Sequence, residues 1–221
     1  MSEAAAAFDQ GFADGGGQLR TWDGEVWELP VPRWIAGAVA GDLSLLSRCH
    51  GSTLDVGCGP GRMTAALTDR GILALGVDVS PLAVAMTRSR GALARYGDIF
   101  SLPGAGCWDH VLLADGNVGI GGDPIRLLWR CRQLLVPGGT VLLDLAPPGQ
   151  GLRVTSAQLV GCSGAGDWFA WAVLGVDALA MVAAAAGLEV ADVWGVEGQS
   201  RRWQAELVAT SRWPATTKVR P

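Results

Sequence analysis

The pattern of hydrophobic and polar positions divides the chain into a regular middle and two less regular ends. Between residues 53 and 145, short apolar runs alternate with longer segments in which apolar residues recur at helical spacing. The short runs predict strands and the longer segments predict helices. Expected strands are 53–56, 72–77, 93–97, 109–114 and 139–145, and expected helices are 61–70, 81–90 and 123–135. Apolar strands separated by helices are typical of a parallel sheet covered on both faces, so we expect a doubly wound α/β domain.

The two ends depart from this alternation. Residues 1–20 are alanine-rich and then glycine-rich without a consistent period, so we interpret residues 1–34 as a flexible N-terminal segment or lid, followed by one helix from Pro32 to Leu46. Runs at 152–160 and 167–174 predict a β-hairpin inserted at 150–175. A helix at 176–186 and strands at 188–194 and 203–210 complete a C-terminal part at 176–210, and the two strands are close enough in sequence to pair antiparallel.

Composition favours one compact domain spanning residues 1–221, because 49% of the residues are hydrophobic and 17% are charged. The formal charge of −4 supplies no broad basic surface, which disfavours a nucleic-acid partner. Five widely spaced cysteines indicate neither a zinc site nor a disulfide framework, and a reduced, cytoplasmic compartment fits them best. We expect no signal peptide, no membrane segment and no bound metal.

A glycine-rich loop follows the first strand of the regular middle. Residues 53–62 read TLDVGCGPGR, with glycines at 57, 59 and 61. Glycine has no Cβ, so backbone N–H groups can approach a ligand at the mouth of the next helix. Asp78 ends the second strand about twenty positions after the first glycine, the spacing at which a carboxylate reaches ribose hydroxyls. Loop and carboxylate together predict a nucleotide-like cofactor.

The third glycine position separates the candidate cofactors. A nicotinamide or flavin fingerprint has glycine or alanine where this chain has Arg62. The segment 54–61 instead resembles motif I of class I S-adenosylmethionine-dependent methyltransferases, of the small-molecule type similar to methyltransferase domains 11, 12 and 25. Four further segments resemble that family's motifs in the same order: GVDVS at 76–80, GDI at 97–99, WDHVLLAD at 108–115 and LLVPGG at 134–139.

The resemblance covers residues 50–146, which we interpret as the cofactor-binding core. It implies a Rossmann-like, mostly parallel seven-stranded sheet with an antiparallel last strand. It also implies an enzyme that uses S-adenosylmethionine and releases S-adenosylhomocysteine. By the same analogy, Asp55 and the Gly57 carbonyl face the ammonium group, Asp78 accepts both ribose hydroxyls, and Asp98 with the Ile99 N–H receives the adenine. The full expected cofactor set is Asp55, Gly57, Cys58, Gly59, Gly61, Asp78, Val79, Gly97, Asp98, Ile99, Ala114, Asp115 and Asn117.

Catalysis of methyl transfer needs positioning and a dry pocket more than a general base, because the methyl carbon is already activated by the positive sulfur. Asp115 follows the fourth strand. We consider two functional roles for it, binding the methionine part of the cofactor or orienting the acceptor, and the alternative is that it only caps a loop. If a base is used, the candidates are His110, His50 and Asp123. The place of His110 inside an apolar strand favours a satisfied core histidine, and His50 precedes the first strand, away from the carboxyl ends where ligands bind. The chain lacks the Asn/Asp-Pro-Pro-Tyr/Phe signature after this strand, which disfavours nucleic-acid bases and glutamine as acceptors.

Acceptor recognition is expected from aromatic residues outside the shared core. They are Trp22, Trp27 and Trp34 near the N-terminus and Trp168, Phe169 and Trp171 in the hairpin, and the competing interpretation is that they pack the sheet edges. We expect a small metabolite methylated on oxygen, nitrogen or carbon by a monomer or homodimer. The alternatives are a non-catalytic S-adenosylmethionine-binding protein, an RNA or protein methyltransferase, and a nicotinamide-dependent oxidoreductase.

Overall fold

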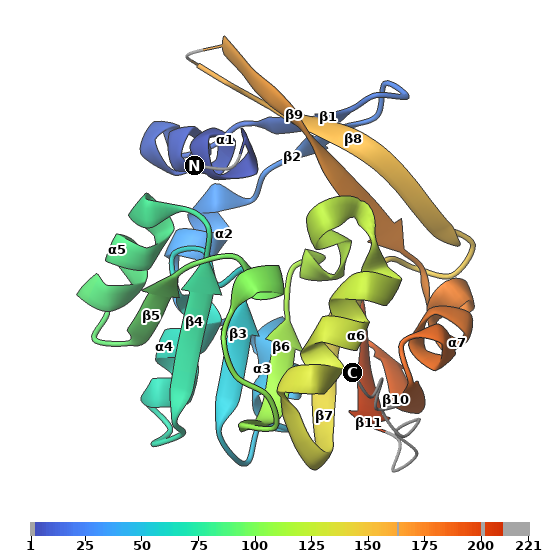
Figure 1. Cartoon of the computed structure of the whole chain (residues 1–221). Helices are drawn as coiled ribbons and strands as arrows, with labels where there is room; N and C mark the ends of the chain where they lie inside the picture. Colours follow the sequence, from blue (N-terminus) through green and yellow to red (C-terminus); the bar gives the residue numbers. More distant parts are fainter. Residues whose placement is uncertain (1–2, 163, 200–201, 210–221) are drawn as a thin grey trace, which may run out of the picture.

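Two sheets organise the computed structural model, which describes residues 3–162, 164–199 and 202–209 (Figure 1). The larger sheet has seven strands in the order β10-β11-β7-β6-β3-β4-β5. The five strands β7, β6, β3, β4 and β5 run parallel to one another, whereas β11 is antiparallel to its two neighbours, β10 and β7. In that order the strands are Leu188–Gly195, Trp203–Ala209, Leu135–Leu145, Trp108–Leu113, Thr53–Val56, Ala74–Asp78 and Leu93–Tyr96. The Rossmann-like prediction, with an antiparallel strand at the end of the chain, is confirmed.

Helices cover both faces of this sheet because its strands are apolar on both sides. Leu112 and Leu142 point to the face that packs against α3 (Ala40–Leu46) and α4 (Arg62–Thr68). Their neighbours Val111 and Leu143 point to the opposite face, which packs against α6 (Pro124–Leu134) and α7 (Val176–Ala185). Successive side chains alternate across a strand, so each strand contributes to two hydrophobic cores. Helix α5 (Pro81–Ser89) begins after β4, with Ser80 as its N-cap.

The predicted helix from Pro32 to Leu46 is wrong in one respect. The chain forms a short helix α2 (Val31–Ile35), leaves helical conformation at residues 36–39 and starts again as α3. The Asp42 carboxylate accepts the Val39 N–H at 3.0 Å, which caps the new helix at that point.

The N-terminal residues, for which the sequence showed no period, also form regular structure. Helix α1 spans Glu3–Asp14, β1 spans Gln18–Thr21 and β2 spans Val26–Glu28. These elements gain their stability from distant partners. Helix α1 contacts β8, β9 and α5, and β1 pairs with β8 through Leu19 and Leu159.

The smaller sheet lies at one end of the larger one, beyond the carboxyl ends of its parallel strands (Figure 1). Its order is β2-β1-β8-β9, and all its pairs are antiparallel. The predicted hairpin is confirmed as β8 (Leu152–Gly161) and β9 (Gly164–Leu174), paired from Leu152↔Leu174 to Gly161↔Gly164. The N-terminal segment extends this hairpin into a four-stranded sheet, which lies with α1 and α2 beside the edge where ligands bind in α/β folds.

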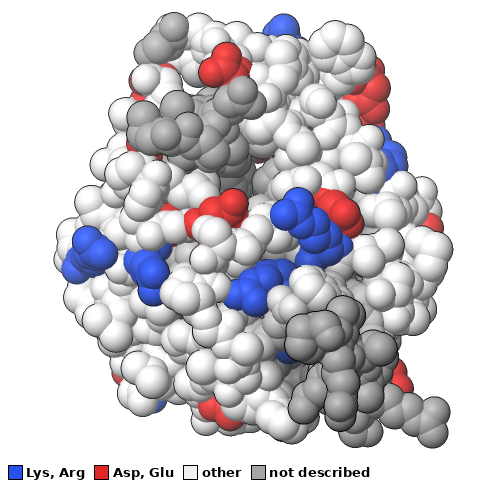
Figure 2. Space-filling model, viewed as in Figure 1, with Lys and Arg blue, Asp and Glu red and all other residues white. Residues whose placement is uncertain are grey.

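Within the described residues, none of the helices is long and apolar enough to cross a membrane. The same residues contain no group of His, Cys, Asp and Glu placed to hold a metal ion. On the face shown in Figure 2, arginine side chains are interspersed with acidic and uncharged residues.

Candidate active site

A cavity of about 150 Å³ lies at the carboxyl ends of β3, β4, β5 and β6. All the residues of the predicted cofactor set except Gly61 line it. Parallel strands end at the same edge of the sheet, which is why motifs separated by up to sixty residues meet here. Phe8 and Phe12 of α1, Trp34 of α2, and Phe169 and Trp171 of β9 close the cavity on the side away from the sheet.

The glycine loop adopts backbone conformations that favour glycine, with φ of 68° at Gly57, 53° at Gly59 and 84° at Gly61. A Cβ on Gly57 would lie 2.7 Å from Asn117 Nδ2, and one on Gly61 would lie 2.5 Å from Thr87 Oγ1. Gly61 is therefore needed for the close contact between α4 and α5, not as part of the cavity lining. Gly59 leaves open space, with only Phe12 at 3.7 Å from such a Cβ.

Asp78 lies where a ribose-binding carboxylate is expected. Its two oxygens accept the backbone N–H groups of Gly59 and Ser80, each at 2.8 Å. Burial raises the pKa of Asp78, and these two hydrogen bonds oppose the rise. The bonds join the end of β4 to the glycine loop, so the carboxylate that would hold a ribose also holds the loop in place.

Asp55 is almost fully buried, at 1% exposure, and accepts a hydrogen bond from Thr64 Oγ1 at 2.6 Å. Burial raises the pKa of Asp55 to about 7. Asn117 donates from Nδ2 to the Val56 carbonyl at 2.9 Å and to the Gly57 carbonyl at 2.8 Å. The Gly57 carbonyl, which the family analogy assigns to the cofactor ammonium, therefore already accepts from Asn117.

At the adenine side, Asp98 ends the loop after β5 and caps the short 3-10 helix η1 (Ile99–Ser101). Its Oδ1 accepts the Phe100 N–H at 2.9 Å, which fixes the side chain at the cavity wall. Ile99 is buried at the same wall.

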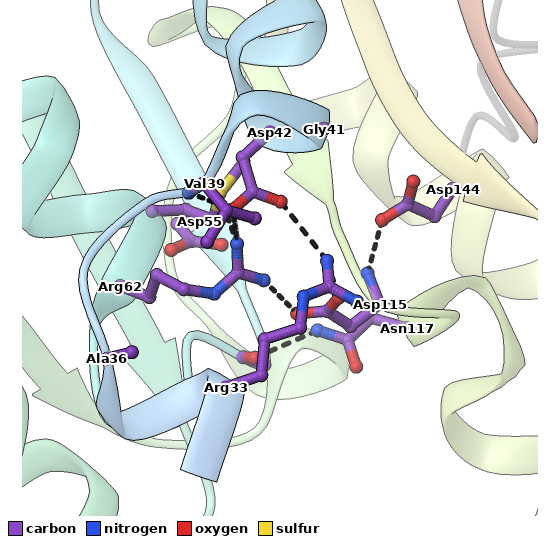
Figure 3. Close-up of polar contacts among 12 residues, drawn as sticks. Arg33, Ala36, Val39, Gly41, Asp42, Asp55, Arg62, Asp115, Asn117 and Asp144 are labelled. Atoms are coloured by element: carbon purple, nitrogen blue, oxygen red, sulfur yellow. Dashed lines mark hydrogen bonds and ion pairs between the residues drawn. The ribbon is translucent and has the colours of Figure 1, made fainter. Parts of the chain in front are cut away.

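Asp115 belongs to a cluster of alternating charges that sequence reasoning missed (Figure 3). Its carboxylate pairs with Arg62 and with Arg33, the latter at 3.1 Å, and both arginines also pair with Asp42. Arg202 joins the same cluster through Asp42 at 2.9 Å and Asp144 at 2.8 Å. Asp42 is fully buried and Arg62 is 3% exposed, so each charge is compensated inside the fold.

Asp115 is the only described residue other than glycine with a positive φ, at 53°, and its N–H donates to Asp144 Oδ2 at 2.6 Å. Because Arg33 and Arg62 engage its two carboxylate oxygens, Asp115 is arranged to be held in place and not to take a proton from an acceptor.

His110 lines neither cavity. Its Nδ1 lies 2.9 Å from Thr140 Oγ1, and its Nε2 accepts the His50 N–H at 3.2 Å. Burial lowers the pKa of His110. Both ring nitrogens have protein partners near the start of β6, so the geometry matches a core histidine and not a general base.

A second cavity, of about 690 Å³, adjoins the first. It lies between the smaller sheet and the edge of the larger one, and Phe8, Trp34, Asp115, Asn117 and Trp171 line both cavities. Opposite the charged cluster, apolar side chains of the N-terminal segment form its wall, including Leu19, Trp27 and Leu29.

The predicted tryptophans of the smaller sheet divide between its two faces, and Trp34 lies on α2. Trp27, Trp34 and Trp171 line the second cavity, whereas Trp22 and Trp168 do not. The rings of Trp22 and Trp168 pack edge to face with centroids 5.3 Å apart, and Trp22 is 76% exposed. Because side chains alternate across a strand, only one face of this sheet can face the cavity, and the alternation cannot be read before the pairing is known.

Comparison with known proteins agrees with this geometry. Residues 54–143 match the family model described as "Methyltransferase domain". The fold is similar to that of a SAM-dependent methyltransferase from Bacteroides fragilis, solved in complex with S-adenosyl-L-homocysteine: the TM-score is 0.78 at 24% identity, over 93% of this chain and 94% of that one.

Two other similar structures cover less of this chain. The CcbJ methyltransferase from Streptomyces caelestis has a TM-score of 0.60 at 20% identity, over 77% of this chain and 94% of its own. The Burkholderia thailandensis 1,6-didemethyltoxoflavin-N1-methyltransferase, solved with 1,6-didemethyltoxoflavin and S-adenosylhomocysteine, has a TM-score of 0.56 at 18% identity, over 77% and 79%. Residues 54–143 therefore match a methyltransferase domain, and the chain has the fold of class I S-adenosylmethionine-dependent methyltransferases.

Proposed function

We propose that the protein transfers the methyl group of S-adenosylmethionine, held in the first cavity, to a small molecule held in the second. The observation that carries this proposal is the wall shared by the two cavities, formed by Trp34, Asp115, Asn117, Trp171 and Phe8. An acceptor in the second cavity would face the methionine end of a cofactor in the first. A non-catalytic cofactor-binding protein would have no need of this adjoining space.

The residues of the first cavity fit the cofactor. Asp78 would accept the ribose hydroxyls, Asp98 and Ile99 would hold the adenine, and the buried carboxylate of Asp55 lies on the side that suits a cationic amino-acid group. The bound cofactor supplies a methyl group on a positively charged sulfur. Two of the similar structures carry S-adenosylhomocysteine, which supports this assignment.

The protein contributes orientation and exclusion of water. Five aromatic rings, from Phe8, Phe12, Trp34, Phe169 and Trp171, line the first cavity opposite the glycine loop. Transfer between two bound molecules gains most from fixed alignment of the reacting atoms and from a dry site, and it needs no proton-transfer residue before the methyl group moves. The partners of Asp115 and His110 are consistent with catalysis of this kind.

The lining of the second cavity suits an acceptor that is a small, flat, amphipathic molecule. One wall of the second cavity carries indole and aliphatic side chains from the N-terminal segment and β9, and the other carries the paired charges of Arg33, Asp115, Asp144 and Arg202. A similar methyltransferase was solved with the small molecule 1,6-didemethyltoxoflavin, which supports the same class of acceptor. The formal charge of −4 argues against a nucleic-acid acceptor. We also propose that residues 1–221 act as one domain, because N-terminal and C-terminal residues both line the second cavity.

The test has two stages. The first is calorimetric titration with S-adenosylmethionine, S-adenosylhomocysteine and NADH, in which only the first two are expected to bind. The second is a screen of flat heteroaromatic and phenolic compounds for release of S-adenosylhomocysteine. NADH binding alone would reject the cofactor assignment, whereas tight cofactor binding with turnover only on a peptide or RNA would reject the small-molecule assignment.

A further inference from the structure

Asp9 links the N-terminal helix to the cofactor-binding core. It lies on α1, outside the lining of both cavities, and is not part of any motif of the regular middle. Its Oδ1 accepts hydrogen bonds from the Ser80 hydroxyl and from the Leu82 N–H, the latter at 3.2 Å. Helix α1 is thereby attached to the first turn of α5, and Figure 1 shows the two helices next to each other.

Ser80 contacts both Asp9 and the expected ribose carboxylate. Its backbone N–H donates to Asp78 Oδ1 at 2.8 Å, while its hydroxyl donates to Asp9 and accepts the Ala83 N–H at 2.9 Å. Ser80 is fully buried, so these bonds are sheltered from water. One residue therefore connects the carboxylate that would hold the cofactor to the carboxylate that holds α1.

Helix α1 forms part of the roof of the first cavity through Phe8 and Phe12. The Phe12 ring is centred 6.2 Å from that of Trp34, and the Phe8 ring is centred 5.8 Å from that of Phe169. Both rings line the cavity together with the glycine loop, so α1 covers the place where S-adenosylhomocysteine would bind.

We propose that α1 is a lid over the cofactor, that Asp9 is its latch, and that Ser80 couples the latch to Asp78. The inference depends on cofactor binding and not on the identity of the acceptor. Ribose hydroxyls that donate to Asp78 would fix the carboxylate that accepts the Ser80 N–H. A bound cofactor thereby holds Ser80 in place, and with it the hydroxyl that donates to Asp9, which stabilises the closed position of α1. Asp9 is in this scheme a positioning residue.

The test measures how fast S-adenosylhomocysteine leaves its complex when it is chased with excess S-adenosylmethionine in a stopped-flow instrument. Asp9→Ala removes the acceptor of two hydrogen bonds and should speed release roughly tenfold. Asp9→Asn keeps an oxygen at the same place, so its release rate should stay within about twofold of the unaltered protein. The matched control is Asp14→Ala, which removes a carboxylate on the same helix that accepts from Gln10 and from the Cys162 N–H but does not contact α5.

Hydrogen exchange of residues 3–14 provides a second readout that a general loss of stability would not reproduce. S-adenosylhomocysteine should slow this exchange in the unaltered protein and in Asp9→Asn but not in Asp9→Ala. Unchanged release in Asp9→Ala, or equal acceleration in Asp14→Ala, would overturn the latch. If no acceptor is found while these effects are present, the latch stands and only the acceptor assignment fails. If the unaltered protein does not bind S-adenosylhomocysteine, both proposals fall.

Discussion

The two adjoining cavities are built in different ways. The cofactor cavity is formed mainly by the ends of parallel strands, each of which carries its functional residue within two or three positions of its own strand end. The second cavity, where we propose that the acceptor binds, is formed by the N-terminal segment, the hairpin and the C-terminal part, which the pairings of β1 with β8 and of β11 with β7 bring together. The first is a property of local motifs on a common scaffold, whereas the second is a property of one particular tertiary arrangement. Loops and added elements that vary around a constant scaffold are where folds acquire specificity.

The charged cluster connects these two regions, and removing its most buried arginine should cause the largest change in stability. Arg62→Met removes the most buried of the arginines that pair with Asp42 and Asp115, so we expect a loss of roughly 3–5 kcal/mol in the free energy of unfolding. Arg33→Met alters a side chain that is 30% exposed and should cost about 1 kcal/mol or less. Denaturant unfolding of both variants measures the difference. Equal losses would mean that burial does not decide how the cluster stabilises the protein.

Asp78→Ala should affect only the cofactor side. It leaves the ribose hydroxyls and the N–H groups of Gly59 and Ser80 without their acceptor, so affinity for S-adenosylmethionine should fall by about 1–3 kcal/mol. Calorimetric titration measures this loss. Unchanged affinity would remove Asp78 from the cofactor site.

Trp27→Ala should affect only the acceptor side, because Trp27 lines the second cavity and not the first. We expect KM for the acceptor to rise about fivefold, equivalent to roughly 1 kcal/mol of lost aromatic contact, while the affinity for S-adenosylhomocysteine stays the same. Trp22→Ala is the control, since Trp22 is exposed on the other face of the smaller sheet. If the control raised KM as much as Trp27→Ala, the acceptor would have to bind elsewhere.

The pH dependence of cofactor binding should show the smallest effect. Burial raises the pKa of Asp55 to about 7, so below pH 7 the empty site holds this carboxyl protonated. The ammonium group of S-adenosylhomocysteine favours the ionised form, and binding must then release a proton. Affinity should therefore increase as pH rises from 6 to 8, by less than about tenfold per pH unit.

The Asp55→Asn variant isolates this contribution. In this variant the affinity for S-adenosylhomocysteine should depend less on pH. Part of the dependence should remain because the pKa of Asp78 is also raised. For the empty protein the sign is opposite: a folded-state pKa raised above 3.8 stabilises the fold at low pH, and this contribution is lost as pH rises through about 7. The Asp55→Asn variant should not show this loss of stability. The free energy of unfolding, measured against pH in both proteins, tests this, and an equal pH dependence would exclude Asp55 as its source.

The sequence by itself determined the cofactor side. Glycine is required where φ is positive and a Cβ would collide, as at Gly57 and Gly61, and such needs are visible residue by residue. The strand, loop and carboxylate spacing that ends at Asp78 is similarly local, because it follows from the length of one βα unit. The hydrophobic periodicity of the middle of the chain predicted its strands and helices because their burial repeats at a fixed interval.

Only the tertiary structure decided the rest. Asp42 and Arg202 are 160 residues apart, and Arg62 and Asp115 are 53 apart, so no local pattern marks them as partners. Whether a tryptophan of the smaller sheet lines the second cavity depended on the face of the sheet that it occupies, and the strand pairing sets that face. Asp9 and Ser80, which are 71 residues apart, came together in the same way, when α1 docked on α5. Local backbone requirements depend on neighbouring residues, whereas charge pairing and the contacts of α1 arise from side chains that meet only after the chain has folded.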